Sequence, residues 1–108
     1  MEEEIKVSII ASAVRPQMWE TFLEPLKSTT VPFEVVFGGP CTEEQTRPFL
    51  EKYKFFKYIK TENIKPSQVY EAARVNAVGE TIHWSADDCE YSPDLIGKSY
   101  RRWKEIND

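Results

Sequence analysis

Residues 65–86 read KPSQVYEAARVNAVGETIHWSA, and this stretch contains the change of pattern that decides the fold. Its first part places apolar residues at three- and four-residue spacing, with Pro66 at the front and Gly79 where the chain must turn away. These features predict a helix over 65–79. The next run, TIHWSA at 81–86, has the length and apolar content of a strand. A helix that leads directly into a strand is typical of an α/β fold.

The same alternation extends over the rest of the chain. IKVSIIA (5–11) is β-branched and almost continuously apolar, as expected of a central strand covered on both faces. KFFKYIK (54–60) mixes aromatic residues with Lys, which suits a strand near the edge of a sheet. The expected strands are 5–11, 33–37, 54–60 and 81–86, and the expected helices are 15–30, one that begins at Thr42, 65–79 and 92–103.

Local signals mark where these helices begin and end. Pro25 should bend or end the first helix early. Thr42 and Gln45 have the spacing of a capping box, in which each side chain satisfies a backbone N–H of the other residue. Ser92 and Pro93 suit the start of the last helix.

Strands and helices that alternate with short connections imply parallel strands joined by right-handed crossovers. We therefore expect an α/β fold, with a mostly parallel sheet of about four strands and helices on both faces. A chain of 108 residues has room for one domain, and its 41% hydrophobic residues suffice for a single core. We expect one domain over residues 1–108.

The charge and the chain ends exclude several classes of partner. The formal net charge of −4 gives no general attraction to nucleic acid or to anionic membranes. No apolar run is long enough to span a bilayer, and the acidic first residues lack the features of a secretory signal. We therefore expect a cytoplasmic protein without a membrane span and without a nucleic-acid partner.

The chain has few cysteine and histidine residues, the side chains that usually bind zinc. Cys41 and Cys89 are the only cysteines and His83 is the only histidine, a set too small for a structural zinc site. We expect two buried, reduced thiols. His83 lies within a strand, which favours a place at the edge of the core over acid–base chemistry, and we expect its neighbour Trp84 in the core as well.

Ligands of open parallel sheets bind beyond the carboxyl ends of the strands. In this chain that edge comprises residues 11–15, 38–41, 61–65 and 86–91. Asp87 and Asp88 lie on it, and neighbouring carboxylates repel each other. The two side chains are therefore either splayed into water at a turn or held together by a positive group such as a divalent cation. Arg15 and Lys65, on the same edge, are either phosphate ligands or surface charges.

Three stretches carry a resemblance to a known family. VSIIASAVRP (7–16), FEVVFGG (33–39) and AVGETIHWSADDCEYSPDLI (77–96) resemble the nucleotide-binding half of inverting glycosyltransferases of family 2, which have the GT-A fold. The third stretch is the most specific, because it combines a helix end, a strand, acidic residues and a Pro-Asp-Leu helix start at the spacing of the family.

The resemblance implies that the chain binds a nucleotide-diphosphate sugar through Mn²⁺ or Mg²⁺. Ser85, Ala86 and Asp87 occupy the positions of the DxD motif, so Asp87 would be the chief metal ligand and Asp88 a helper. The cation would neutralise the negative charge of the departing nucleotide diphosphate. The nucleotide-binding residues implied by the resemblance are Ala11, Ser12, Ala13, Arg15, Gly38, Gly39, Lys65 and Ala86.

The chain also departs from the family pattern. Ser85 replaces the first Asp of the motif, and Gly38 and Gly39 stand where family members carry the Asp that reads the base. The resemblance covers only the first half of the family domain, so no catalytic residue is assigned. Two hypotheses remain open: a glycosyltransferase-like protein that transfers sugar with inversion, and a non-catalytic binding or assembly module. We expect a homodimer, because half of such a fold leaves sheet edges uncovered.

Overall fold

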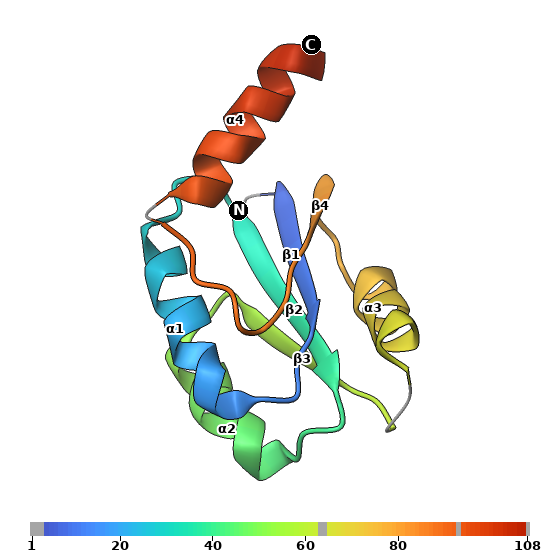
Figure 1. Ribbon diagram of the computed structural model, residues 1–108. Coiled ribbons are helices and arrows are strands. Elements are labelled where there is room, and N and C mark those ends of the chain that lie inside the picture. Colours follow the sequence, from blue (N-terminus) through green and yellow to red (C-terminus); the bar gives the residue numbers. More distant parts are fainter. Residues whose placement is uncertain (1–3, 63–64, 93, 108) are drawn as a thin grey trace.

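A computed structural model describes residues 4–62, 65–92 and 94–107 (Figure 1). The expected role of Pro93 at the start of the last helix lies outside the described residues. The strands are β1 (Val7–Ser12), β2 (Phe33–Gly39), β3 (Phe56–Lys60) and β4 (Thr81–Trp84). The α-helices are α1 (Trp19–Leu23), α2 (Glu43–Lys52), α3 (Pro66–Val75) and α4 (Leu95–Asn107), and the 3-10 turns η1 (Pro16–Met18) and η2 (Glu24–Ser28) flank α1.

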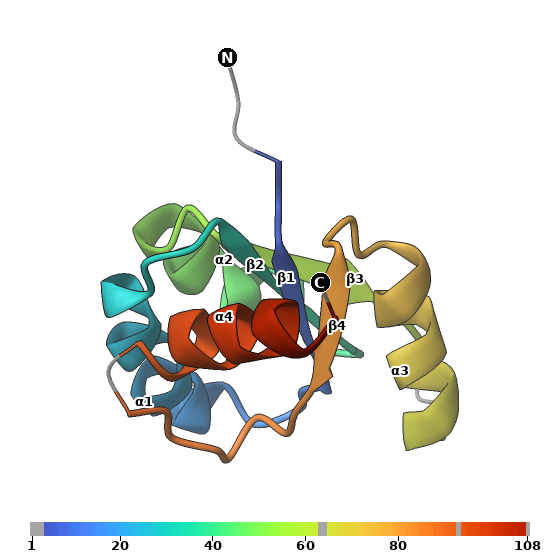
Figure 2. The same ribbon diagram turned by 90° about the horizontal axis from the view of Figure 1, so that it is seen from above.

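The four strands form one parallel sheet in the order β3-β2-β1-β4. In the central strand, Ile9 lies between Val35 of β2 and His83 of β4. Figure 2 shows α1, α2 and α4 on one face of the sheet and α3 on the other. The predicted α/β class, the parallel sheet and the helices on both faces are confirmed.

Most of the core lies between the sheet and the helices α1 and α2. Trp19 is fully buried there, and its ring contacts the rings of Phe37, Phe49 and Phe56. A smaller cluster under α3 is centred on Ile10, Val36 and Ala73. Each large apolar side chain that is fully buried contributes about 1.5–3 kcal/mol to stability, so the layer around Trp19 holds most of the fold's stabilisation.

The first helical segment is shorter than expected. The chain is α-helical only over Trp19–Leu23 and continues as the 3-10 turn η2, which contains Pro25. Proline lacks the N–H that an α-helix needs and disturbs the preceding turn. The prediction that Pro25 ends the α-helix early is confirmed, whereas a helix over the whole of 15–30 is wrong.

The start of α2 follows the sequence signal. Thr42 Oγ1 accepts a hydrogen bond from Gln45 N at 3.2 Å, and Gln45 Oε1 accepts one from Thr42 N at 2.8 Å. The predicted capping box is confirmed. The box satisfies two N–H groups that the first turn of a helix would otherwise leave without partners.

Two burial predictions are wrong. Trp84 is 57% exposed because β4 is an edge strand, and the helix on that face, α3, lies over β1 and β2. Cys41 is buried as expected, but Cys89 is exposed on the loop after β4. None of the helices in the described ranges is long and apolar enough to cross a bilayer.

A polar network lies on the α3 side of the sheet, in which Ser8 and Glu34 are buried and Lys57 is partly exposed. Ser8 Oγ donates a hydrogen bond to Glu34 Oε2 at 2.6 Å, and Lys57 Nζ lies 2.7 Å from Glu34 Oε1. Val78 N donates to Glu34 Oε2 at 2.7 Å, and Gly79 N donates to Ser8 Oγ at 2.8 Å. Ser8, Glu34 and Lys57 belong to β1, β2 and β3. Their contacts with each other and with the turn before β4 hold that turn against the sheet, and so help to position β4.

Candidate functional site

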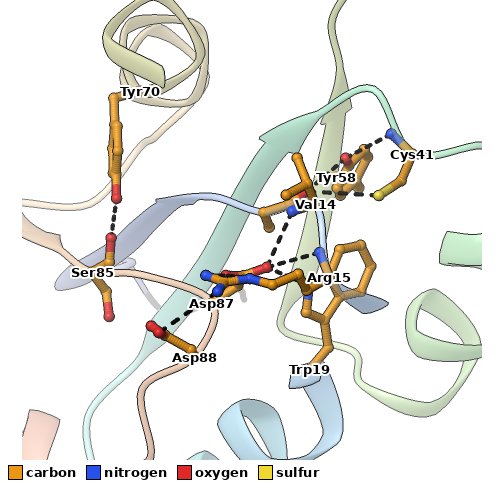
Figure 3. A network of polar contacts seen from close by, with 10 residues as sticks. Val14, Arg15, Trp19, Cys41, Tyr58, Tyr70, Ser85, Asp87 and Asp88 are labelled. Carbon is orange, nitrogen blue, oxygen red and sulfur yellow. Dashed lines mark hydrogen bonds and ion pairs between the residues drawn. The ribbon is translucent and has the colours of Figure 1, made fainter. Parts of the chain in front are cut away.

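The loop after β4 runs past α1 toward α4 (Figure 1). It brings Asp87 against the loop that follows the carboxyl end of β1. The side chain of Asp87 is completely buried. Its Oδ2 accepts hydrogen bonds from Val14 N at 3.1 Å, Arg15 N at 3.0 Å and Trp19 Nε1 at 3.3 Å. Its Oδ1 accepts from Arg15 Nε at 3.1 Å and from Arg15 Nη2 (Figure 3).

The loop after β1 explains why a carboxylate is needed here. Ala13 N still donates to Gly38 O of β2 at 2.8 Å, but the chain then turns into η1 at Pro16. The N–H groups of Val14 and Arg15 therefore have no strand partner, and Asp87 satisfies both. A buried carboxylate is tolerated because charged and polar donors surround it. Asp87 thus joins the loop after β1 to the loop after β4.

The neighbouring Asp88 has a different environment. Its side chain is 49% exposed, and its Oδ2 lies 3.8 Å from Arg15 Nη1. The side chain of Arg15 is 46% exposed, so its guanidinium bridges the buried and the exposed carboxylate. The hydrogen bond and the negative charge of Asp87 raise the pKa of Arg15, which stays charged. The sequence left two arrangements open for the aspartates, splayed into water or held together by a positive group. The structure combines them, because Arg15 holds the pair together and Asp88 also reaches water.

Residues 83–86 and 89–91, on either side of the two aspartates, border a hollow at the surface. The hollow has a volume of about 440 Å³, and its lining includes Trp84, Ala86, Cys89 and Glu90. On its inner side Tyr91, whose pKa is raised by burial, donates a hydrogen bond to Ser85 Oγ at 2.7 Å. The hydroxyl of Tyr70 donates to the carbonyl of Ser85 (Figure 3). Tyr70 of α3 and Tyr91 of the loop itself therefore hold the start of this loop.

The two glycines at the end of β2 are used in packing. A β-carbon at Gly38 would lie 2.9 Å from Val69 Cγ1, and one at Gly39 would lie 2.6 Å from both Ala13 O and the Tyr58 hydroxyl. The absence of side chains lets α3 and the loop after β1 approach β2 closely. In this arrangement the glycines face protein atoms, and their role toward a nucleotide stays a prediction.

The other implied nucleotide-binding residues divide into two groups. Ala11 and Ala13 are buried, whereas Ser12 and Ala86 are partly exposed at the same edge of the sheet. Lys65 is exposed directly before α3. Among the residues that the structure describes, Lys65 makes no hydrogen bond or ion pair with Arg15, Asp87 or Asp88. The structure therefore brings Arg15 and the two aspartates together and leaves Lys65 apart.

Two side chains that organise the site were not identified from the sequence. The indole of Trp19 donates to Asp87, and the hydroxyl of Tyr58 donates to Ala13 O at 3.0 Å and accepts from Cys41 N at 3.1 Å. Burial raises the pKa of Tyr58, so its hydroxyl remains protonated and able to donate. Nothing in the sequence pattern marks Trp19, because its apolar spacing on a helix is equally that of a core residue.

A divalent cation fits only part of this arrangement. Both oxygens of Asp87 are already bound, and Arg15 occupies the position of a positive partner. Within the described ranges no cluster of three or more His, Cys, Asp or Glu side chains could enclose a metal ion. Asp88 alone presents a carboxylate at the surface. Asp87 as the chief metal ligand stays a prediction that requires Arg15 to move, whereas Asp88 can offer an oxygen without rearrangement.

Comparison with known proteins adds no family assignment. No protein-family model matches the chain, and no curated protein matches its sequence.

Proposed function

We propose that this chain is a glycosyltransferase-like domain that binds a nucleotide-diphosphate sugar, with the diphosphate beside Arg15 and Asp88. One observation supports this proposal above the others. Asp87 ties the loop after β1 to the loop after β4, so that Arg15 and Asp88 meet beyond the ends of two adjacent parallel strands. Open parallel sheets bind their ligands at this edge.

The charges of the site indicate what must accompany the ligand. One guanidinium and two carboxylates leave a net negative charge, which repels a diphosphate. We therefore expect Mn²⁺ or Mg²⁺ to bind together with the ligand, held by Asp88, by oxygens of the diphosphate and by water. Such a cation supplies charge neutralisation for the nucleotide diphosphate as a leaving group. Arg15 contributes a second positive charge that Asp87 keeps in place.

Calorimetric titration tests the proposal. UDP, GDP and their common sugar conjugates are titrated with and without Mn²⁺ into the wild type, Asp88→Asn and Glu90→Gln. Glu90 is the matched control because it is an exposed carboxylate on the same loop. We expect binding that depends on Mn²⁺ and that Asp88→Asn abolishes while Glu90→Gln retains. Absence of binding at millimolar ligand contradicts the proposal.

A second candidate function is a non-catalytic assembly module that forms a homo-oligomer. It is favoured by the apolar side chains that β4 exposes, Ile82 at 37% and Trp84 at 57%. Exposed apolar residues that gather on one element are typical of protein interaction sites. Turnover of a nucleotide sugar with any acceptor would exclude the second candidate, because a non-catalytic module transfers no sugar.

A further inference from the structure

The backbone of β4 is hydrogen-bonded on one side. Thr81 N donates to Lys6 O and Ser85 N donates to Ile10 O, both at 2.9 Å, so these groups face β1. Consecutive N–H groups of a strand point to opposite sides. The N–H and C=O groups of Ile82 and Trp84 therefore point to the outer edge, where no strand of the described residues pairs with β4.

The two edges of the sheet differ in how they are protected. At the β3 edge, Lys57 and Lys60 lie among the strand residues, and Lys side chains on an edge oppose pairing with another strand. β4 has the sequence TIHW and carries no Asp, Glu, Lys, Arg or Pro. The sheet is thus protected at one edge and open to strand addition at the other.

Apolar surface continues from β4 onto both faces of the sheet. On the α3 side, the rings of Trp84 and Tyr70 lie 5.2 Å apart. On the α4 side, a hollow of about 220 Å³ separates β4 from α4, and Trp103, 39% exposed, is among the residues that line it. A strand added to β4 would therefore bring its side chains against apolar surface on both faces.

We infer that β4 pairs antiparallel with β4 of a second copy of this chain about a two-fold axis, so that one sheet continues through both copies. This inference deepens the assembly role given above as the second candidate function and rests on it. A second copy suits the edge because an antiparallel pair of identical strands is self-complementary. Each strand also brings an uncharged segment to the other, so no like charges meet across the pair despite the net charge of −4.

Substitution at the edge tests the interface. Molecular mass is measured by light scattering during size-exclusion chromatography for the wild type, Ile82→Lys and Leu50→Lys. Leu50 on α2 is the matched control, because it is 39% exposed against 37% for Ile82 and lies beside the other edge of the sheet. We expect a dimer for the wild type and Leu50→Lys, and a monomer for Ile82→Lys. If Ile82→Lys does not give a folded circular dichroism spectrum, Trp84→Lys is compared instead.

Amide hydrogen exchange provides a readout of strand pairing itself. We expect the amides of Ile82 and Trp84 to exchange at least ten times more slowly at a protein concentration that gives dimer than at one that gives monomer. A wild-type monomer at high micromolar concentration overturns the inference. A dimer that survives the folded edge variant, or that leaves these amides unprotected, places the interface elsewhere and also overturns it. Nucleotide titration of the wild type judges the first proposed function independently.

Discussion

Gly97 of α4 lies directly against the carboxylate of Asp94, and a β-carbon at residue 97 would be 2.1 Å from Asp94 Oδ1. That carboxylate accepts hydrogen bonds from Thr30 N at 2.8 Å and from Arg101 Nη2 at 3.0 Å. Thr30 Oγ1 would also lie 2.7 Å from the added carbon. The missing side chain therefore lets Asp94 connect the start of α4 to the segment before β2.

Gly97→Ala should lower the free energy of unfolding by about 1–3 kcal/mol, because the added carbon displaces the Asp94 carboxylate. In an exposed helix the same change would raise stability by about 1 kcal/mol. Urea denaturation measures the difference, with Ser99→Ala at an exposed position of α4 as the control. A gain of stability for Gly97→Ala would show that Asp94 and Thr30 move aside at no cost.

Asp87→Asn should be far more destabilising than Asp88→Asn. The change removes the negative charge that Arg15 and two backbone N–H groups share in a buried position. We expect a loss of about 2–4 kcal/mol for Asp87→Asn and of less than about 0.5 kcal/mol for the exposed Asp88. Denaturant unfolding of the two variants measures both values. Equal losses would contradict the division of roles between the two aspartates.

The Glu34 network should make stability depend on pH. Burial raises the pKa of Glu34, but the hydrogen bonds from Lys57, Ser8 and Val78 lower it by more, so the pKa lies below its ordinary value of 4.5. A carboxyl group with a lowered pKa in the folded state stabilises fully above its unfolded pKa. That contribution is lost as the pH falls through the lower, folded-state value.

Thermal unfolding between pH 3 and pH 7, a range of about four pH units around the carboxyl titration, measures this dependence. Glu34→Gln should be less stable than the wild type at pH 7 and should lose less stability on acidification. Glu44→Gln, at an exposed position of α2, is the control and should follow the wild type. Parallel curves of stability against pH for the wild type and Glu34→Gln would mean that the ionisation of Glu34 does not contribute to the pH dependence.

His83 should titrate below its ordinary pKa of 6.5, because burial lowers the pKa of its imidazole. The neutral ring is favoured in the folded state, so its contribution to stability is complete above pH 6.5 and decreases as the pH falls toward the lower, folded-state pKa. The chain has one histidine, so the ring C–H signals of a proton NMR titration come from His83 alone and report the value. The same titration in urea gives the pKa of His83 in the unfolded chain. An equal pKa in the folded protein would contradict the burial of this imidazole.

The two cysteines should react at different rates. Cys89 is exposed and Cys41 is buried, where its Sγ lies 3.7 Å from Ala13 O. A thiol-reactive chromogenic reagent should therefore modify one thiol per native chain and two after unfolding in guanidinium. Cys89→Ser should remove the fast reaction, whereas rapid modification of both native thiols would show that the loop after β1 opens readily.

Much of the fold could be predicted because the patterns that reveal it are local. Apolar periodicity and the Thr42–Gln45 box depend on neighbours in sequence, and the structure agrees with both. The exposure of Trp84 could not be predicted in this way. An apolar strand looks the same whether a helix covers it or not, and only the placement of α3 over β1 and β2 leaves this ring at the surface.

The candidate site was predictable in position but not in its contacts. Two adjacent aspartates after a strand identify the loop, and Arg15 follows from its place at the same edge. The burial of Asp87 depends on the N–H groups of Val14 and Arg15 and on the indole of Trp19, which are distant in sequence. No local pattern records such a contact, so the sequence leaves open which aspartate is buried.

The hydrogen bond between Val14 N and Asp87 Oδ2 spans 73 residues, and this separation bears on the order of folding. Contacts between residues far apart in sequence form late, because the loop-closure entropy must be overcome before they are gained. β1 and β2 are nearby in sequence and can pair early, but the loop that carries Arg15 stays without its partner until β4 has docked. The Arg15–Asp88 pair therefore exists only once β4 has docked on β1, and ligand binding there would report that the first and last strands of the chain have come together.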